Sequence, residues 1–323
     1  SRNLVPKTPG LNNRGLKGYS NLDLAGNARP KAPDNVPDIG AYEYYISPND
    51  IDLEGIPFPT IAKTGNNEIG ILIKNNGSKT YSDTVFVQYR IGTSSWVSDT
   101  AVFSSLNIGQ VDTFYFTKQW NISSSGTFDV CATISPNVLN DPDSLVGDTI
   151  CTTKCVGRQG TATIDASGNG DYKTCSAAIS SLACGIAGPI KFEVKAGTYK
   201  ERLTISSILG ASATNTVTFE GANRDQVILE YDGTSSLPAS VLIDDADYIS
   251  FKNFTIVNQC DQVSSGFWIR ENAHDISIEN CKILLDSVTA NYGTAGILVA
   301  NSATSSGATI PGNTSHDITI KNN

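Results

Sequence analysis

The chain has 323 residues, a formal net charge of −9, 39% hydrophobic residues and 17% charged residues. This length accommodates two or three domains, and the abundance of Gly, Ser, Thr and Asn favours strands over helices. An acidic surface repels nucleic acids and anionic lipids, and no stretch approaches the roughly 20 apolar residues of a membrane helix. We therefore expect neither nucleic-acid partners nor membrane insertion.

Residues 1–46 show little regular periodicity and are rich in loop-forming residues. Within residues 20–45, a D-x-x-G-N-x-R stretch is followed by D-I-G-A-Y-E. This pair of motifs resembles the closing segment of right-handed parallel β-helix proteins secreted by bacteria. The resemblance implies a β-helix upstream in a longer protein; an ordinary proline-rich linker is the alternative. The matching residues are Asp23, Gly26, Asn27, Arg29, Asp38, Ile39, Gly40, Ala41, Tyr42 and Glu43.

Residues 47–156 predict an immunoglobulin-like β-sandwich. Strand-like runs such as "EIGILIKNNGS" and "TVFVQYRIG" recur between turn signals, and their apolar residues alternate. The alternating positions are Ile69, Ile71 and Ile73, then Val85, Val87 and Tyr89. A length near 110 residues suits such a module. The pattern is similar to the spacer modules of bacterial surface proteins.

The seven cysteines contain no CxxC pair, and His274 and His316 are the only histidines, so a zinc cluster is not expected. We expect Cys131 to pair with Cys151, because a strand, a turn and a returning strand separate them. Cys175 and Cys184 bracket a short helical pattern and could form a second pair. Cys281 aligns with an inward position of the repeat described below and is expected to be a buried free thiol. Disulfides would place the chain outside the cytosol.

Residues 157–323 begin with "TATIDASGNGDYKTCSAAI", for which there are two interpretations. Asp165, Asn169 and Asp171 alternate as in a calcium loop, so calcium is a possible cofactor, and no other is expected. However, no bidentate Glu follows at the spacing of an EF-hand loop. The residues Cys175, Ala178, Ile179 and Leu182 then fall on one face of a short helix. We favour a turn that leads into a helical cap on a solenoid, whose open end needs covering.

The same region resembles the start of pectin methylesterases and their β-helix relatives. The residues that carry this resemblance are Asp165, Gly168, Gly170, Asp171, Tyr172, Lys173 and Thr174, then Gly197, Thr198, Tyr199, Lys200, Glu201 and Arg202. It implies the N-terminal part of a pectin-lyase-like parallel β-helix. In that family an aspartate pair acts with glutamine and arginine, in motifs of the type Q-A-V, D-F-I-F-G and L-G-R-P-W. None of these motifs occurs here, so we expect no enzyme activity from this chain and interpret Tyr199 and Glu201 as structural.

A repeat supports the solenoid independently. The segments "DYISFKNF", "HDISIENC" and "HDITIKNN" align from Asp247, His274 and His316. Alternation points one set of side chains inward, another outward, and places an asparagine at each turn. The inward set is Ile249, Phe251, Ile276, Ile278, Ile318 and Ile320; the outward set is Lys252, Glu279 and Lys321; the turn residues are Asn253, Asn280 and Asn322.

A second ladder, "VLI", "FWI" and "ILV", points Leu242, Trp268 and Leu298 outward. An exposed aromatic with aliphatic neighbours could stack on a sugar or contact a protein, unless a loop covers it. Nearby carboxylates could form a hydrolase site or a calcium-dependent lyase site, or they could decorate the turns. We favour turns, and the equivalent repeat positions of His274 and His316 also favour a turn role. The carboxylate cluster comprises Asp244, Asp245, Asp247, Glu271 and Asp275, with Arg270.

Five Asp-Ser/Thr-apolar triplets are similar to the O-glycosylation sequence of Bacteroidetes bacteria, although such short patterns also arise by chance. The acceptors would be Thr84, Thr100, Ser144, Thr149 and Ser287.

Together these patterns predict an all-β chain: a β-helix closing segment (1–46), an immunoglobulin-like spacer (47–156) and the first turns of a second, helix-capped β-helix (157–323). The resemblance points to a section of a large, repetitive, extracellular cell-surface adhesin of the Bacteroidetes type, including those of gliding motility, exported by a type IX system. Its partners would be neighbouring modules and a carbohydrate or cell-surface ligand. The alternative is an extracellular pectin esterase or lyase type of enzyme with catalytic turns beyond residue 323.

Overall fold

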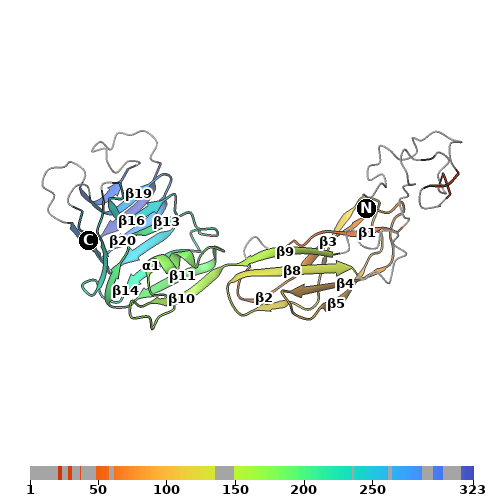
Figure 1. Ribbon diagram of the computed structural model, residues 1–323, viewed down its shortest axis with the longest axis horizontal. Helices are drawn as coiled ribbons and strands as arrows, with labels where there is room; N and C mark the ends of the chain where they lie inside the picture. The colour runs from red at the N-terminus through yellow and green to blue at the C-terminus, as the bar shows by residue number, and fades with distance from the viewer. Residues whose placement is uncertain are drawn as a thin grey trace. The chain divides into compact units, whose positions relative to one another are not determined.

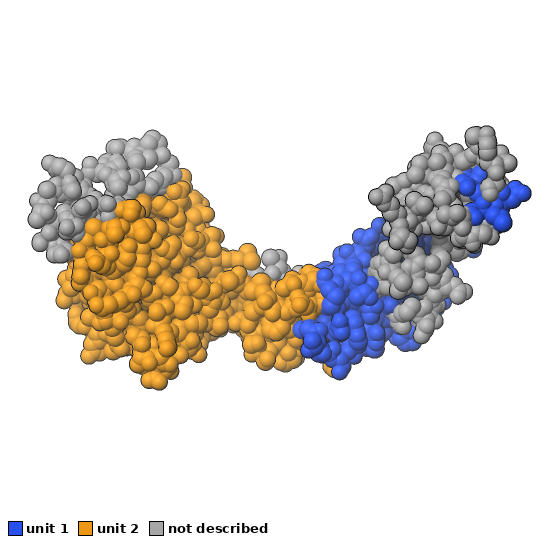
Figure 2. All heavy atoms as spheres, in the orientation of Figure 1, with its two compact units in different colours: residues 1–57, 70–117, 131–151 blue, residues 58–69, 118–130, 152–323 orange. Residues whose placement is uncertain are grey.

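The computed structural model describes residues 21–23, 28–30, 37, 49–57, 62–134, 149–234, 236–260, 264–285, 294–300 and 314–323. These group into two compact units (Figure 2). The first comprises residues 1–57, 70–117 and 131–151, and the second comprises residues 58–69, 118–130 and 152–323. Most of the expected closing segment, including Gly26, Asn27 and residues 38–43, lies outside the described residues.

Two sheets build the predicted immunoglobulin-like sandwich (Figure 1). One has the order β1-β3-β6, from Ile51–Gly55, Gly70–Asn75 and Val111–Tyr115, and its strands pair antiparallel. The other has the order β5-β4-β8-β9, from Val97–Val102, Thr84–Ile91, Gly126–Ile134 and Thr149–Val156. The predicted alternation is confirmed, because Ile69, Ile71, Ile73, Val85, Val87 and Tyr89 are all buried. In the second unit, β2 (Gly65–Asn67) pairs with β7 (Trp120–Ile122).

From residue 158 onward, the described part of the second unit forms the predicted parallel β-helix, which has about four turns. Each complete turn contributes one strand to each of three sheets, and the first sheet has one further strand at each end. The first sheet contains β10 (Arg158–Ile164), β11 (Ile186–Val194), β14 (Val217–Gly221), β17 (Ile249–Lys252), β20 (His274–Glu279) and β23 (His316–Lys321). The second contains β12 (Gly197–Lys200), β15 (Val227–Tyr231), β18 (Thr255–Asn258) and β21 (Lys282–Leu285). The third contains β13 (Leu203–Ser206), β16 (Ala239–Asp244), β19 (Ser265–Arg270) and β22 (Ala295–Val299).

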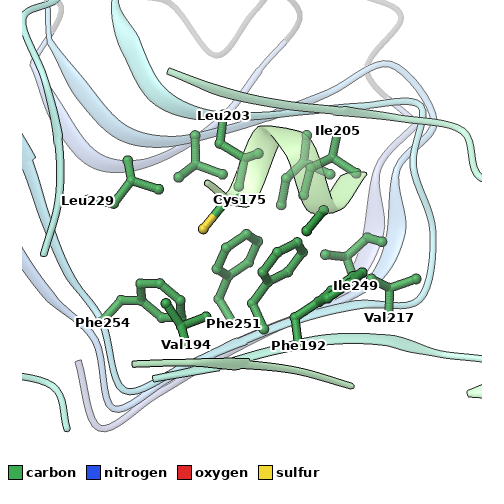
Figure 3. Close-up of a cluster of buried hydrophobic side chains, with 14 of the residues drawn as sticks. Cys175, Phe192, Val194, Leu203, Ile205, Val217, Leu229, Ile249, Phe251 and Phe254 are labelled. Atoms are coloured by element: carbon green, nitrogen blue, oxygen red, sulfur yellow. The ribbon is translucent and has the colours of Figure 1, made fainter. Parts of the chain in front are cut away.

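The core is a set of side-chain columns that run from turn to turn (Figure 3). Phe192, Phe219 and Phe251 stack with centroid distances of 5.0 Å at each step. The predicted isoleucine column is confirmed: Ile249 lies beside the strand of Ile276, and Ile276 is in direct register with Ile318. The repeat also extends further towards the N-terminus than predicted, because β11 and β14 contribute Phe192 and Phe219.

The predicted left-handed conformation of the asparagine turns is confirmed. Asn253, Asn280 and Asn322 have φ angles of 62°, 50° and 56°, in the left-handed region that asparagine tolerates. The Asn280 amide donates to Asn253 Oδ1 at 2.7 Å, and the Asn253 amide donates to the Gly221 carbonyl at 3.2 Å. The side chains therefore tie successive turns together at the corner of the β-helix.

A short helix covers the first turn, as predicted. Helix α1 (Cys175–Ser180) has Thr174 as its N-cap, whose Oγ1 accepts the Ala177 N–H at 3.0 Å. Cys175, Ala178 and Leu182 are buried against the core, and Ile179 is partly buried beside them.

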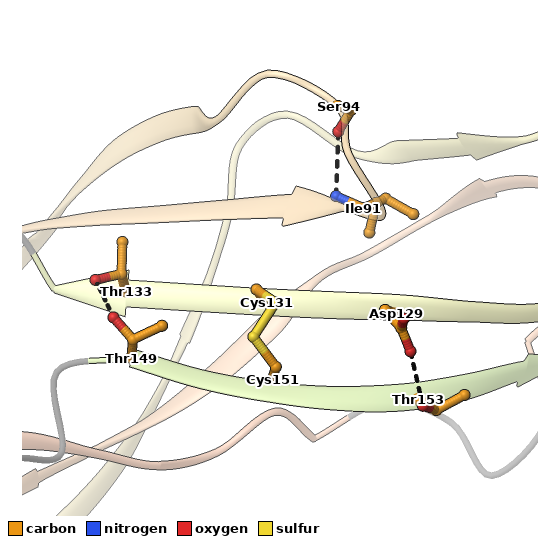
Figure 4. The surroundings of a disulfide bond; sticks show 8 residues. All are labelled: Ile91, Ser94, Asp129, Cys131, Thr133, Thr149, Cys151 and Thr153. Atoms are coloured by element: carbon orange, nitrogen blue, oxygen red, sulfur yellow. Dashed lines mark hydrogen bonds between the residues drawn. A yellow bond between two sulfur atoms is a disulfide. The ribbon is translucent and has the colours of Figure 1, made fainter.

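The structure contains two disulfides in its described part, and one differs from expectation. Cys131 bonds Cys151 between β8 and β9, the expected pair, flanked by the Thr133–Thr149 and Asp129–Thr153 hydrogen bonds (Figure 4). Cys184 bonds Cys155 and not Cys175, so the second expected pair is wrong. The reason is that Cys175 lies on the inward face of α1, fully buried in the core, whereas the Arg158 N–H bonds the Gly185 carbonyl and brings the end of β9 beside Cys184.

Candidate functional site

The outward row of the third sheet is present but covered. Leu242, Trp268 and Leu298 are in register across β16, β19 and β22. Trp268 is 7% exposed and Leu242 is 5% exposed. The Trp268 Nε1–H donates to the Ala300 carbonyl at 2.6 Å, and the Arg270 guanidinium lies 4.8 Å from the indole centroid. Of the two alternatives, an exposed stacking aromatic or a covered one, the structure matches the second, because Ala300 and Arg270 help to shield the outward-pointing ring from solvent.

Three of the five carboxylates next to this row, those of Asp244, Asp247 and Asp275, have side-chain or backbone partners. Asp244 accepts both the Nε–H and the NH2 group of Arg270 at 2.8 Å, which raises the pKa of Arg270. Asp247 accepts the His274 N–H at 3.1 Å, and its other oxygen lies 3.2 Å from His274 Nε2. Asp275 lies 2.9 Å from His274 Nδ1. Asp245, Glu271 and Asp275 also have positive φ angles, which is typical of turn positions.

The Asp/Gly/Asn turn satisfies its carboxylates internally. Asp165 Oδ1 accepts the N–H and hydroxyl of Ser167 at 2.8 and 2.6 Å, while Asp171 Oδ2 accepts both groups of Thr163 at 2.7 and 2.8 Å. These hydrogen bonds lower the pKa of both carboxyls. The Asn169 amide donates to Ser167 Oγ. Among the described residues, no group of three His, Cys, Asp or Glu side chains is placed to hold a metal. Calcium at this turn stays a prediction.

Tyr199 and Glu201 have structural contacts in the cap. The buried Tyr199 hydroxyl lies 3.1 and 2.8 Å from the carbonyls of Ile164 and Lys195. The Glu201 carboxylate accepts the N–H groups of Cys175 and Ser176 at 2.7 and 2.9 Å. Glu201 thus satisfies two amides at the start of α1 that have no partner within the helix.

We predict that Glu201→Ala lowers the free energy of unfolding by about 1 to 2 kcal/mol, the cost of a lost helix cap. The measurement is the urea midpoint of the intact protein. Glu193→Ala is the matched control, because Glu193 makes only a 3.5 Å surface ion pair with Lys191 among its described ion pairs and is expected to change stability by less than about 0.5 kcal/mol. Equal midpoints for the two variants would contradict the capping role.

The free thiols are buried in the described structure. Burial raises the pKa of Cys175 well above its usual value, that of Cys281 to about 11, and that of the Tyr199 hydroxyl to about 12. These groups bind their protons more tightly in the folded state than in the unfolded chain. Their contribution to the free energy of unfolding is therefore fully present below about pH 8.5 and falls as the pH rises further.

We therefore predict that the urea midpoint declines between about pH 9 and pH 11. A Cys281→Ala variant, compared with wild type over the same range, should show a shallower decline because one of the groups with a raised pKa is gone. A midpoint that stays constant to pH 11 would contradict the burial of these groups.

The glycosylation candidates differ in their surroundings. Thr84 and Thr100 are half-buried on β4 and β5, and each N–H bonds the carboxylate of the preceding aspartate at 2.7 and 2.8 Å. Thr149 is exposed at the start of β9. Ser144 and Ser287 lie outside the described residues.

A hollow on the outer face of the first sheet was not predicted from the sequence. It has a volume of about 390 Å³ and lies over β14, β17 and β20. We call it the Ser250 hollow and define it by Thr218, Tyr248, Ser250, Lys252, Ser277 and Glu279. The repeat did contain a signal: Tyr248 occupies the turn position that Asp275 and Asp317 occupy in the next two copies.

Comparisons with known proteins find similarity to solved structures only. No protein-family model matches the chain, and no curated protein matches it. One similar structure is the CARDB domain of a Pyrococcus furiosus protein in complex with di-metal ions, at 17% identity and a TM-score of 0.29, covering 36% of this chain and 94% of that one. A mutant pectin methylesterase in complex with a hexasaccharide is 18% identical, with a TM-score of 0.34, and covers 45% of this chain and 47% of its own.

The pectin methylesterase PemA from Erwinia chrysanthemi is 16% identical, with a TM-score of 0.28, and covers 41% of this chain and 46% of its own. The chain thus spans about half the length of these pectin methylesterases. Because the identities and TM-scores are low, the description of the fold rests on the strand pairing given above.

Proposed function

We propose that this chain is a structural and adhesive section of a large, repetitive, secreted cell-surface protein. One observation carries the proposal: three carboxylates of the cluster that could have formed a catalytic site, Asp244, Asp247 and Asp275, are engaged within the β-helix, while the Ser250 hollow, which Asp275 also lines, offers space for a ligand. Arg270 is held by Asp244, and Asp247 and Asp275 both contact His274. These contacts run between turns or within a turn, and they stiffen the solenoid.

The disulfides support an extracellular location. Cys131–Cys151 and Cys155–Cys184 require an oxidising environment to form and persist. No helix in the described residues is long and apolar enough to cross a membrane. The finer assignment, to Bacteroidetes-type adhesins exported by a type IX system and O-glycosylated on Asp-Ser/Thr sites, rests on the sequence motifs. Its most accessible described acceptor is Thr149, and intact-mass measurement of the protein from its native host tests it.

The experiment that tests the proposal combines a glycan array with pectin esterase and pectin lyase assays on the intact protein. Glycan binding without release of methanol or of unsaturated sugars is the expected result. Turnover of any polymer would overturn the proposal in favour of an extracellular polysaccharide-active enzyme. Failure to bind any glycan would remove carbohydrate as the adhesive ligand and leave a spacer role.

A further inference from the structure

The Ser250 hollow contains a row of hydroxyl groups at regular spacing. Thr218, Ser250 and Ser277 are direct register partners on three successive strands, so neighbouring hydroxyls lie roughly one strand spacing apart, about 4.8 Å. Ser277 Oγ donates to Glu279 at 2.9 Å. Ser250 Oγ is shielded from solvent and has no hydrogen-bond partner among the described residues. An unpaired buried hydroxyl costs free energy, and rotation about χ1 that turns it into the hollow would let a ligand hydroxyl remove that cost.

Tyr248 adds an aromatic side chain to the same hollow at a conformational cost. Its φ angle is 59°, which is unfavourable for a bulky residue, whereas the equivalent Asp275 and Asp317 tolerate the same turn. The ring packs edge-on against His274 at a centroid distance of 5.3 Å, and Tyr248 lines the hollow. A strained residue that persists beside a cavity is a reason to look for function there.

The charges of the hollow select against an anionic ligand. Lys252 is the one cation among its described lining residues, and its Nζ lies 3.7 Å from Glu279 Oε2. Asp275 adds a further negative charge to the lining. For a uronate polymer, the charge of Lys252 is already neutralised by Glu279, and Asp275 would repel its carboxylates. An uncharged polyol is not repelled and can form hydrogen bonds with the donors and acceptors of the hollow. The volume of about 390 Å³ falls in the range of small-ligand sites.

We propose that the Ser250 hollow binds a short uncharged stretch of a glycan, with Tyr248 packing on a sugar ring and Ser250 Oγ bonding a sugar hydroxyl. The inference rests on the proposed adhesive function and gives it a site and a ligand class. The site lies on the face of the first sheet, away from the Trp268 row of the third sheet.

The test compares three variants of the intact protein by calorimetric titration with neutral oligosaccharides that the array identifies and with oligogalacturonate. Tyr248→Asn removes the ring and relieves the backbone, so affinity should fall by about tenfold or more while Tm stays constant or rises. Ser250→Ala should weaken binding by about threefold to tenfold. Tyr115→Asn, which replaces a tyrosine that is 56% exposed in the other unit, should leave affinity unchanged.

The outcomes separate this inference from the proposed function. Neutral glycans that bind both Tyr248→Asn and Ser250→Ala as tightly as wild type would overturn the site but leave carbohydrate adhesion intact. Tighter binding of oligogalacturonate than of neutral glycans, weakened by salt, would overturn the ligand class. A wild-type protein that binds no glycan would contradict carbohydrate adhesion itself, and this inference with it.

Discussion

Replacing Phe251 by alanine is expected to lower the free energy of unfolding of the β-helix by about 3 to 5 kcal/mol. The Phe251 side chain is fully buried. Its ring stacks on Phe219 at 5.0 Å and meets Phe254 and Phe267 edge-on at 5.7 and 5.3 Å. Truncation removes contacts to the turn below, to its own turn and across the core to the third sheet. The resulting cavity cannot close, because the backbone on all sides is held by ladder hydrogen bonds.

The measurement is urea unfolding followed by the fluorescence of Trp268, in a background where Trp96 and Trp120 are replaced by phenylalanine. Phe86→Ala is the matched control, since Phe86 is 50% exposed on β4 and should change stability by no more than about 0.5 kcal/mol. A loss below about 1 kcal/mol for Phe251→Ala would mean that the aromatic column is not close-packed.

Hydrogen exchange adds a spatial readout to the same variant. In a solenoid each turn contacts only its neighbours, so the lost protection should centre on β14, β17 and β20 and fade along the stack. Uniform loss across all strands would indicate that the β-helix unfolds as one cooperative unit and not turn by turn.

The side-chain columns could be predicted because they follow from local periodicity. Alternation in a strand assigns Ile276 and Ile318 to the inside, and the recurrence of the motif places them in one column, without any knowledge of distant contacts. The same reasoning explains Asn253 and Asn280, whose left-handed conformation is a property of the turn itself. Phe192 and Phe219 were not predicted as members of a column, because their strands, "IKFEV" and "VTFEG", lack the asparagine that marks the later copies.

The candidate site was much harder to predict from the sequence, because the burial of an outward-pointing side chain depends on which distant segments pack against it. Alternation correctly points Trp268 away from the core, but the hydrogen bond from its indole to the Ala300 carbonyl comes from a residue 32 positions away. The Ser250 hollow likewise arises from three strands brought together by the winding of the chain. Neither feature is encoded in the spacing of any single segment.

The prediction of the second disulfide failed for a related reason. Cys175 and Cys184 flank one helix, which suggested that they pair, yet α1 directs Cys175 into the core. Cys155 is 29 positions from Cys184, and the two meet because β10 starts beside the end of the cap. This contact is set by tertiary structure, and sequence separation carries no information about it.

Replacing both Cys155 and Cys184 by alanine is the second change with a large expected effect, a loss of about 3 to 4 kcal/mol in the stability of the cap. The chain between the two cysteines contains all of β10 and α1. The bond therefore limits the freedom of the whole cap in the unfolded state. Without it, opening of the cap would expose the buried Ile164 and Ile186 to water.

The matched control is Cys131→Ala with Cys151→Ala, which removes a bond of similar span, 20 positions, between β8 and β9. Hydrogen exchange should then show lost protection in residues 158–186 for the first pair of substitutions and in β8 and β9 for the second. Because each bond constrains a different closed segment, the two patterns should not overlap. Equal loss of cap protection in both variants would mean that the Cys155–Cys184 bond does not hold the cap, and that the packing of α1 on the first turn does so alone.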